Sequence, residues 1–114
     1  RIAIPMLFSE ENRTIYTSDI KEITNEALKI SPQGIIAALE GMKIRNDQTL
    51  IYKKAAFPIQ MIIGKQDPAL EYATLIEQTK NTNVQVVEFP DGHMSHIENK
   101  NELILAFQNF IKKC

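Results

Sequence analysis

The sequence is poor in several features that would place it in a particular class of protein. It has one cysteine among 114 residues, Cys114, and cannot form a disulfide within the chain. This favours a reducing compartment, and we expect a cytoplasmic protein. The net charge is −1 and basic residues form no block, which argues against nucleic acid or an anionic membrane as a partner. The sequence also has no apolar run of membrane-spanning length and no signal-peptide pattern.

The composition is otherwise that of an ordinary folded domain. Hydrophobic residues make up 44% and charged residues 24% of the chain, which suits one domain with a modest core. The chain begins at Arg1 rather than methionine, and we expect a fragment or a processed product. Strand patterns occur only in the second half. The sequence therefore divides into a helical part, 1–56, and a mixed part, 57–114.

The mixed part has the pattern of a β-α-β unit. Residues 59–63 form a short apolar run that ends at Gly64, typical of a strand buried in a parallel sheet. Residues 68–80 have apolar side chains at helical spacing, and residues 84–89 alternate like a second strand. A helix between two strands joins them in parallel by a right-handed crossover. The predicted fold class is therefore α/β.

Two side chains that can carry chemistry follow the predicted strands. Asp67 lies in the loop after the first strand, and His93, preceded by Gly92, lies in the loop after the second. Because loops at the carboxyl ends of parallel strands share one edge of the sheet, we expect Asp67 and His93 to lie within hydrogen-bond reach. Gly92 would let the backbone turn tightly there. The second loop leads into a last helix, which a capping box of Asn99 and Glu102 would open.

The first half of the chain is predicted to be helical. Ser9 is placed to cap a first helix. Ser31 before Pro32 marks the start of a second, because serine suits the N-cap and proline the first helical position. A third helix is predicted from residue 46 to about residue 55. On the second helix the apolar side chains are candidates for the wall of a substrate pocket or for the core, and the core is favoured: Ile35, Ile36, Leu39 and Met42.

The two loops and their order resemble a known family. The segments GKQDP after the first strand and FPDGHMSHIE around the second are similar to the C-terminal part of an α/β-hydrolase. Residues 1–56 resemble the helical cap or lid of that family, and residues 57–114 the C-terminal part of its core. The resemblance implies a nucleophile–histidine–acid triad in which His93 is the general base and Asp67 orients it. It implies no cofactor and no metal.

The nucleophile of such a triad is absent from the sequence. The family carries it on a sharp strand-to-helix turn of the G-x-S-x-G kind, and none of the four glycines frames such a motif. We expect the 114-residue chain to be inactive alone, and the intact protein to act on a small ester, lactone or related substrate. An aspartate nucleophile would instead indicate cleavage of epoxides or carbon–halogen bonds. A G-x-S-x-G or G-x-D-x-x motif in the upstream reading frame would support the enzyme.

The same residues also have plainer interpretations. His93 can be a turn histidine that caps the last helix, and Asp67 before Pro68 is a good helix N-cap, although one carboxylate can fill both roles. His96 is interpreted as structural. A metal site of Asp67, His93 and His96 is disfavoured, because the sequence contains no further histidine.

Two functions from other classes remain open. One is a non-enzymatic interaction or binding module that retains a hydrolase-like scaffold, and the other is a β-α-β binding domain unrelated to hydrolases. In each case a two-stranded sheet is marginal by itself, and the strand of residues 59–63 has an unprotected edge. We expect a homodimer or higher oligomer formed through this edge or through the helices of residues 1–56.

Overall fold

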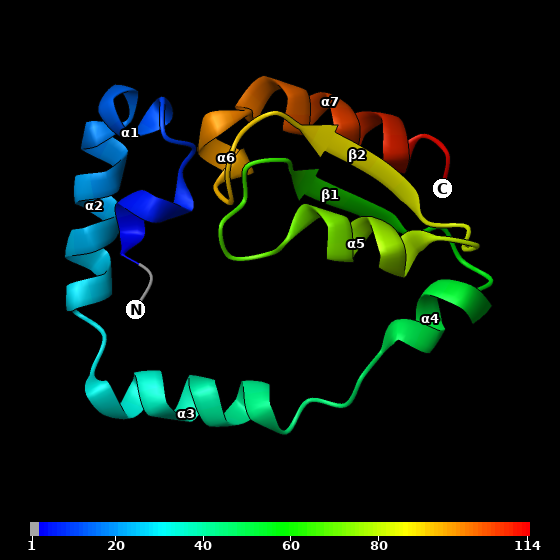
Figure 1. The fold of residues 1–114 in the computed structure, drawn as a ribbon, viewed down its shortest axis with the longest axis horizontal. Helices are drawn as coiled ribbons and strands as arrows, with labels where there is room; N and C mark the ends of the chain where they lie inside the picture. The colour runs from blue at the N-terminus through cyan, green and yellow to red at the C-terminus, as the bar shows by residue number, and fades with distance from the viewer. Residues whose placement is uncertain (1–2) are drawn as a thin grey trace.

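The computed structural model describes residues 3–114, and Figure 1 shows their arrangement. The chain forms a two-stranded parallel sheet, a helix that joins the strands, and further helices before and after this unit. In chain order the elements are η1 (Ile4–Leu7, a 3-10 helix), α1 (Asn12–Ile15), α2 (Thr17–Leu28), α3 (Pro32–Lys43), α4 (Thr49–Lys54), β1 (Gln60–Gly64), α5 (Tyr72–Thr79), β2 (Gln85–Phe89), α6 (Ser95–Glu98) and α7 (Lys100–Ile111).

The sheet consists of β1 and β2, which run in the same direction. Gln60 lies opposite Gln85, and Gly64 lies opposite Phe89. Helix α5 connects the strands and packs on β1, while α7 runs beside β2 and lines a shallow groove with it. This arrangement confirms the predicted β-α-β unit with parallel strands. Both strands therefore end at the same edge, where the loops that contain Asp67 and His93 begin.

The connection between β1 and α5 differs from the expected one. The pattern predicts a helix from Pro68 with Asp67 as its N-cap, but α5 begins at Tyr72. The Oδ1 atom of Asp67 instead accepts the backbone N–H groups of Ala69 and Leu70, at 2.8 and 3.1 Å. An aspartate that bonds the backbone two residues further on stabilises a turn of its own, so the helix starts later.

The capping predictions have mixed outcomes. Ser31 caps α3 as expected, since its Oγ accepts the N–H of Gly34 at 3.1 Å. The other two predictions are wrong. The Ser9 hydroxyl donates to a carboxylate, that of Asp91, and the Asn99 side chain makes no cap bond at the start of α7 but donates to the same carboxylate. In both cases a tertiary hydrogen bond takes the side chain that the local pattern assigns to a cap.

Little of the apolar surface is buried. Within residues 3–114 the buried apolar side chains are Phe8, Ile63 and Phe89. Phe8 directly follows η1, whereas Ile63 and Phe89 lie at the carboxyl ends of the two strands. The small core therefore gathers where the N-terminal segment meets the edge of the sheet, and it supports that edge.

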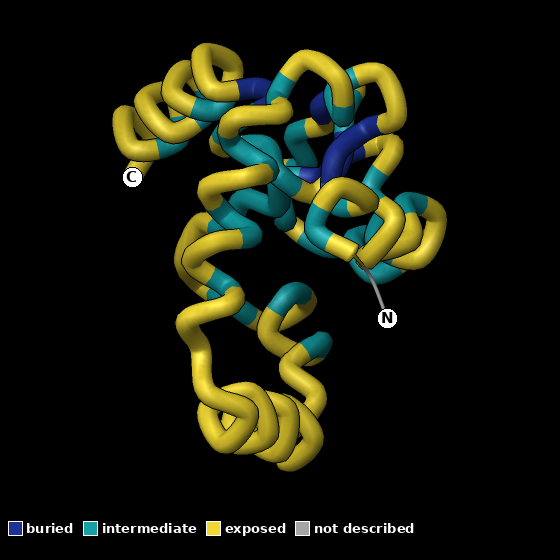
Figure 2. Tube along the Cα trace, turned by 90° about the vertical axis from the view of Figure 1, so that its left-hand side faces the viewer, coloured by how far each residue is buried: buried dark blue, intermediate teal, exposed yellow. Residues whose placement is uncertain are grey.

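The helix α3 lies at the far side of the molecule from the sheet, and all its residues are exposed (Figures 1 and 2). Ile35, Leu39 and Met42 are 47%, 51% and 57% exposed. The interpretation of these side chains as core is therefore wrong for the described part of the chain. The cause is the path of the chain, which carries α3 away from the sheet between α2 and α4 instead of folding it onto the β-α-β unit.

Candidate active site

The carboxyl ends of the two strands bring Asp67 and His93 together. Asp67 lies in the loop after β1, and His93 lies in the loop after β2. The Nδ1 atom of His93 is 2.7 Å from the Oδ2 atom of Asp67, across 26 positions of sequence. The parallel crossover produces this contact, because it returns the chain to the same edge of the sheet. The predicted contact between the two side chains is confirmed.

The Asp67 carboxylate has two separate tasks. Its Oδ1 atom closes the turn at Ala69 and Leu70, and its Oδ2 atom faces the imidazole of His93. The side chain is only 6% exposed, whereas that of His93 is 39% exposed. The turn thus fixes the acid before it meets the histidine, and the histidine keeps one side of its ring open to solvent.

The contact with Asp67 favours the Nδ1–H tautomer of the neutral His93 imidazole. An ionised carboxylate has no proton to donate, so Nδ1 of His93 must donate to Asp67. The other ring nitrogen, Nε2, then has a free lone pair and can accept a proton. Within the described part of the chain Nε2 makes no hydrogen bond. The pair is therefore chemically suited to general base catalysis by Nε2.

Two glycines allow the loops at this edge to approach closely. A Cβ atom on Gly64 would lie 2.1 Å from the carbonyl oxygen of Gly92, and one on Gly92 would lie 2.6 Å from the carbonyl oxygen of Leu7. Neither glycine has a positive φ angle. Gly92 therefore serves close packing of three backbone segments where the chain bends, and this bend needs no left-handed backbone conformation.

The N-terminal segment takes part in the site, which the sequence analysis did not anticipate. The N–H of His93 donates to the carbonyl oxygen of Leu7 at 2.7 Å. The Ser9 hydroxyl donates to Oδ1 of Asp91 at 3.0 Å, two residues before His93. Glu98, which is buried, also binds both segments. A backbone carbonyl leaves no mark on a sequence, and the distant partners of an acidic side chain such as Glu98 are not visible in it either.

A solvent-exposed cluster fixes the two ends of the loop that carries Asp67. Lys65, just after β1, lies 3.1 Å from Glu88 of β2, and the hydroxyl of Tyr72, the first residue of α5, donates to the same carboxylate at 2.5 Å. The hydrogen bonds from Tyr72 and Lys65 lower the pKa of Glu88. The bond to Glu88 raises the pKa of Lys65 and that of Tyr72. The loop is thereby tied to one carboxylate from both sides.

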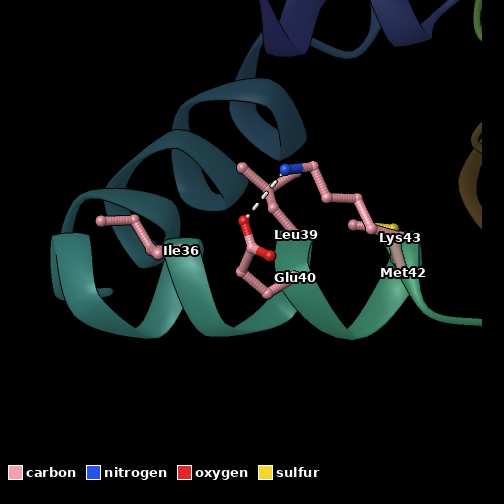
Figure 3. A pocket seen from close by; sticks show the side chains of 5 residues that line it. All are labelled: Ile36, Leu39, Glu40, Met42 and Lys43. Atoms are coloured by element: carbon pink, nitrogen blue, oxygen red, sulfur yellow. Dashed lines mark hydrogen bonds and ion pairs between the residues drawn. The ribbon is translucent and has the colours of Figure 1, made fainter.

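The other predicted site residues lie elsewhere. Leu39 and Met42, with Ile36, Glu40 and Lys43, line an open hollow on α3, and Figure 3 shows the ion pair of Glu40 and Lys43 there. Ile35 lines a different hollow, which α3 shares with α2 and η1. Because α3 and the loop between β2 and α6 lie on opposite sides of the molecule, the structure does not bring the first hollow to His93 (Figures 1 and 2).

Within the part of the chain that the structure describes, Asp67 and His93 have neither a metal-binding cluster nor a bonded hydroxyl or thiol. No group of three His, Cys, Asp or Glu side chains there could hold a metal ion, and His96 is exposed. No hydroxyl or thiol of residues 3–114 bonds the His93 ring. Ser9 and Ser31 use their hydroxyls elsewhere, in the contacts with Asp91 and Gly34. In the described residues the pair of Asp67 and His93 is thus hydrogen-bonded to no hydroxyl or thiol that could act as a nucleophile.

In residues 3–114 no helix has the length and apolar character needed to cross a bilayer. No protein-family model matches the chain, and no curated protein matches its sequence.

Proposed function

We propose that the chain supplies the general base and the orienting acid of a hydrolytic site of the nucleophile–histidine–acid type, as in α/β-hydrolases. The observation that carries the proposal is the 2.7 Å contact between Nδ1 of His93 and Asp67, with Nε2 left open. The position of both residues after parallel strands supports it further. The nucleophile and the oxyanion-binding groups would come from polypeptide outside the described residues.

The proposed reaction is acyl transfer to water. Nε2 of His93 takes the proton of the nucleophile as its oxygen attacks the carbonyl carbon of a small ester or lactone. The Asp67 carboxylate stabilises the resulting imidazolium and holds the ring in place. The imidazolium then gives its proton to the departing alkoxide. A water molecule hydrolyses the acyl intermediate by the same two proton transfers. An aspartate nucleophile, which has no proton to give, would use His93 only to activate this water.

The proposal extends to the organisation of the intact protein. Residues 1–56 would form the cap of the enzyme and residues 57–114 the end of its core. A cytoplasmic location belongs to the same proposal, since the lone Cys114 is exposed and unpaired by any disulfide. A homo-oligomer that covers the exposed apolar faces is also part of it.

The test uses the protein encoded by the whole reading frame that contains this sequence. Hydrolysis of a panel of small esters and lactones is measured for the unmodified protein and for His93→Ala, Asp67→Asn and His96→Ala. We expect Asp67→Asn to lower kcat by about 10⁴-fold and His93→Ala by about 10⁶-fold, because triad members act as a unit. His96→Ala, the matched control, should remain within a few fold. Full activity of His93→Ala, or an initiation codon directly before Arg1, would overturn the proposal.

One observation favours a second candidate, a non-enzymatic interaction module. Helix α3 exposes Ile35, Ile36, Leu39 and Met42 together, and a row of this kind on a solvated helix is typical of a surface that binds protein. For this function His93→Ala would leave binding intact, whereas Leu39→Glu would abolish it. The two substitutions therefore separate the two candidates.

A further inference from the structure

Glu98 is an acidic side chain buried beside the histidine loop. It is 8% exposed and lies at the end of α6. Each of its two carboxylate oxygens accepts two hydrogen bonds. Oε1 accepts from the backbone N–H of Ser9 at 2.7 Å and from Nδ2 of Asn12 at 3.0 Å. Oε2 accepts from the backbone N–H groups of Gly92 and Met94, at 3.1 and 3.2 Å. A buried carboxylate is costly unless such donors surround it, so this site is built around a charge.

The four donors belong to two segments of chain. Ser9 and Asn12 lie in the N-terminal segment, while Gly92 and Met94 are the neighbours of His93 on either side. The N–H of His93 itself donates to Leu7 in the N-terminal segment. The three consecutive backbone N–H groups of residues 92–94 are therefore all hydrogen-bonded. Two of them donate to Glu98, and the third donates to the N-terminal segment, which is itself bonded to Glu98 through Ser9. Hydrogen bonds to a charged acceptor are stronger than those between neutral groups.

We infer that Glu98 is a positioning residue for His93. It acts through the backbone on both sides of the histidine, and it sets the direction in which the imidazole leaves the chain toward Asp67. The Asp67 turn fixes the acid independently, so the 2.7 Å contact between the side chains depends on the histidine loop being held as well. The inference rests on the proposed function, since a held imidazole matters chemically only if His93 acts as a base.

The substitution Glu98→Gln tests this role with little change in shape. A glutamine keeps one acceptor oxygen and replaces the other by an NH₂ group, which would face two donors and leave them unpaired. The matched control is Glu22→Gln, the same chemical change on an exposed residue of α2. Asn12→Ala is a milder variant, because it removes one of the four donors and leaves the carboxylate in place.

The readout is the tautomer of His93 in the folded 114-residue chain, measured from long-range ¹H–¹⁵N correlations of the imidazole, with the exposed His96 as internal reference. In the unmodified protein His93 should be the Nδ1–H tautomer. We expect Glu98→Gln to lower the ratio of the Nδ1–H to the Nε2–H form about fivefold, the factor for one lost hydrogen bond. Asn12→Ala should lower it less, and Glu22→Gln should leave it unchanged. A loss of overall stability alone would not change the tautomer of molecules that remain folded.

The outcomes distinguish a failure of the proposed function from a failure of the positioning role of Glu98. If the unmodified protein lacks the Nδ1–H form, the proposed function fails before Glu98 is considered, and the positioning role fails with it. If that form is present and Glu98→Gln folds with an unchanged ratio, the positioning role is overturned while the proposed function stands. If Glu98→Gln does not fold, Asn12→Ala decides: a lowered ratio supports the role, and an unchanged one overturns it.

Discussion

Asp67 holds the Nδ1 atom of His93 at 2.7 Å with one carboxylate oxygen and closes its own turn with the other. The turn fixes the position of the carboxylate, so Asp67 cannot follow the imidazole if His93 moves. The relationship therefore depends on two separately fixed loops at one edge of the sheet.

The substitution Asp67→Asn should invert the tautomer of His93 without melting the turn. The new amide can still accept from Ala69 and Leu70 through its oxygen, which turns its NH₂ group toward Nδ1 of His93. Nδ1 must then accept, and the ring proton moves to Nε2. Asp67→Ala should lose the turn as well, seen as faster amide exchange at Ala69 and Leu70. Retention of the Nδ1–H form in Asp67→Asn would contradict this account of the pair.

The substitution Gly92→Ala should destabilise the protein by about 1–3 kcal/mol, the usual cost of overpacking. Its Cβ atom would lie 2.6 Å from the Leu7 carbonyl oxygen, a rigid backbone atom. Gly41→Ala is the matched control, since no atom beyond its neighbours and the backbone of its own helix α3 lies within 4 Å of its Cβ position. It should stabilise the chain by about 0.5–1 kcal/mol. Urea unfolding measures both, and equal effects of the two substitutions would refute the close-packing role of Gly92.

The sequence was sufficient to predict what depends on local pattern and on the geometry of parallel strands. The β-α-β unit, its parallel direction and the meeting of Asp67 with His93 follow from two apolar runs and the helix between them. The contacts of Leu7, Ser9 and Glu98 could not be predicted, because they join segments more than 80 positions apart through backbone atoms or a carboxylate. The Ser9 hydroxyl and the Asn99 amide both donate to Asp91, and these two contacts explain why neither residue acts as a cap.

The cluster of Glu88, Lys65 and Tyr72 should give stability a measurable pH dependence. The lowered pKa of Glu88 means that its contribution is present above the ordinary value of 4.5 and is lost as the pH falls through the lower folded value. The raised pKa values of Lys65 and Tyr72 mean that their contributions are present below 10.5 and 10.0 and are lost as the pH rises through the raised values.

Glu88→Gln should therefore flatten the dependence of Tm on pH at both the acid and the alkaline end. The change should be small, because the cluster is exposed to solvent and weakened by salt. Glu22→Gln, an exposed glutamate of α2, serves as the control and should leave the curve as it is. A Glu88→Gln curve that coincides with that of the unmodified protein would contradict the role of the cluster.

The 114-residue chain alone should not hydrolyse a nitrophenyl ester above the background rate. It carries the proposed base and orienting acid, but no hydroxyl or thiol of the described residues is hydrogen-bonded to Nε2 of His93. Since triad members act as a unit, a partial set contributes little. Robust turnover by the purified chain that His93→Ala abolishes would show that a nucleophile is present and would contradict this expectation.

The chain should also associate with itself, because its sheet has an open edge. Gln85 N–H donates to Ile59 and Lys65 N–H donates to Phe89, so the odd-numbered residues of β1 face β2. The backbone groups of Gln60 and Ile62 consequently point to the outer edge. No charged residue or proline lies within β1 to protect that edge from strand addition.

Exposed apolar side chains on the helices add a second reason for association. Ile35, Ile36, Leu39 and Met42 of α3 are each about half exposed, as are Ile104 and Phe107 of α7. Light scattering at micromolar concentration should therefore give at least twice the chain mass of 13.0 kDa. Ile62→Pro should shift the equilibrium toward monomer if pairing uses β1, because proline removes the outward N–H and keeps the bonds to β2. Leu39→Glu should do so if the helices pair. A clean monomer with fast amide exchange at Ile62 would defeat both forms of the prediction.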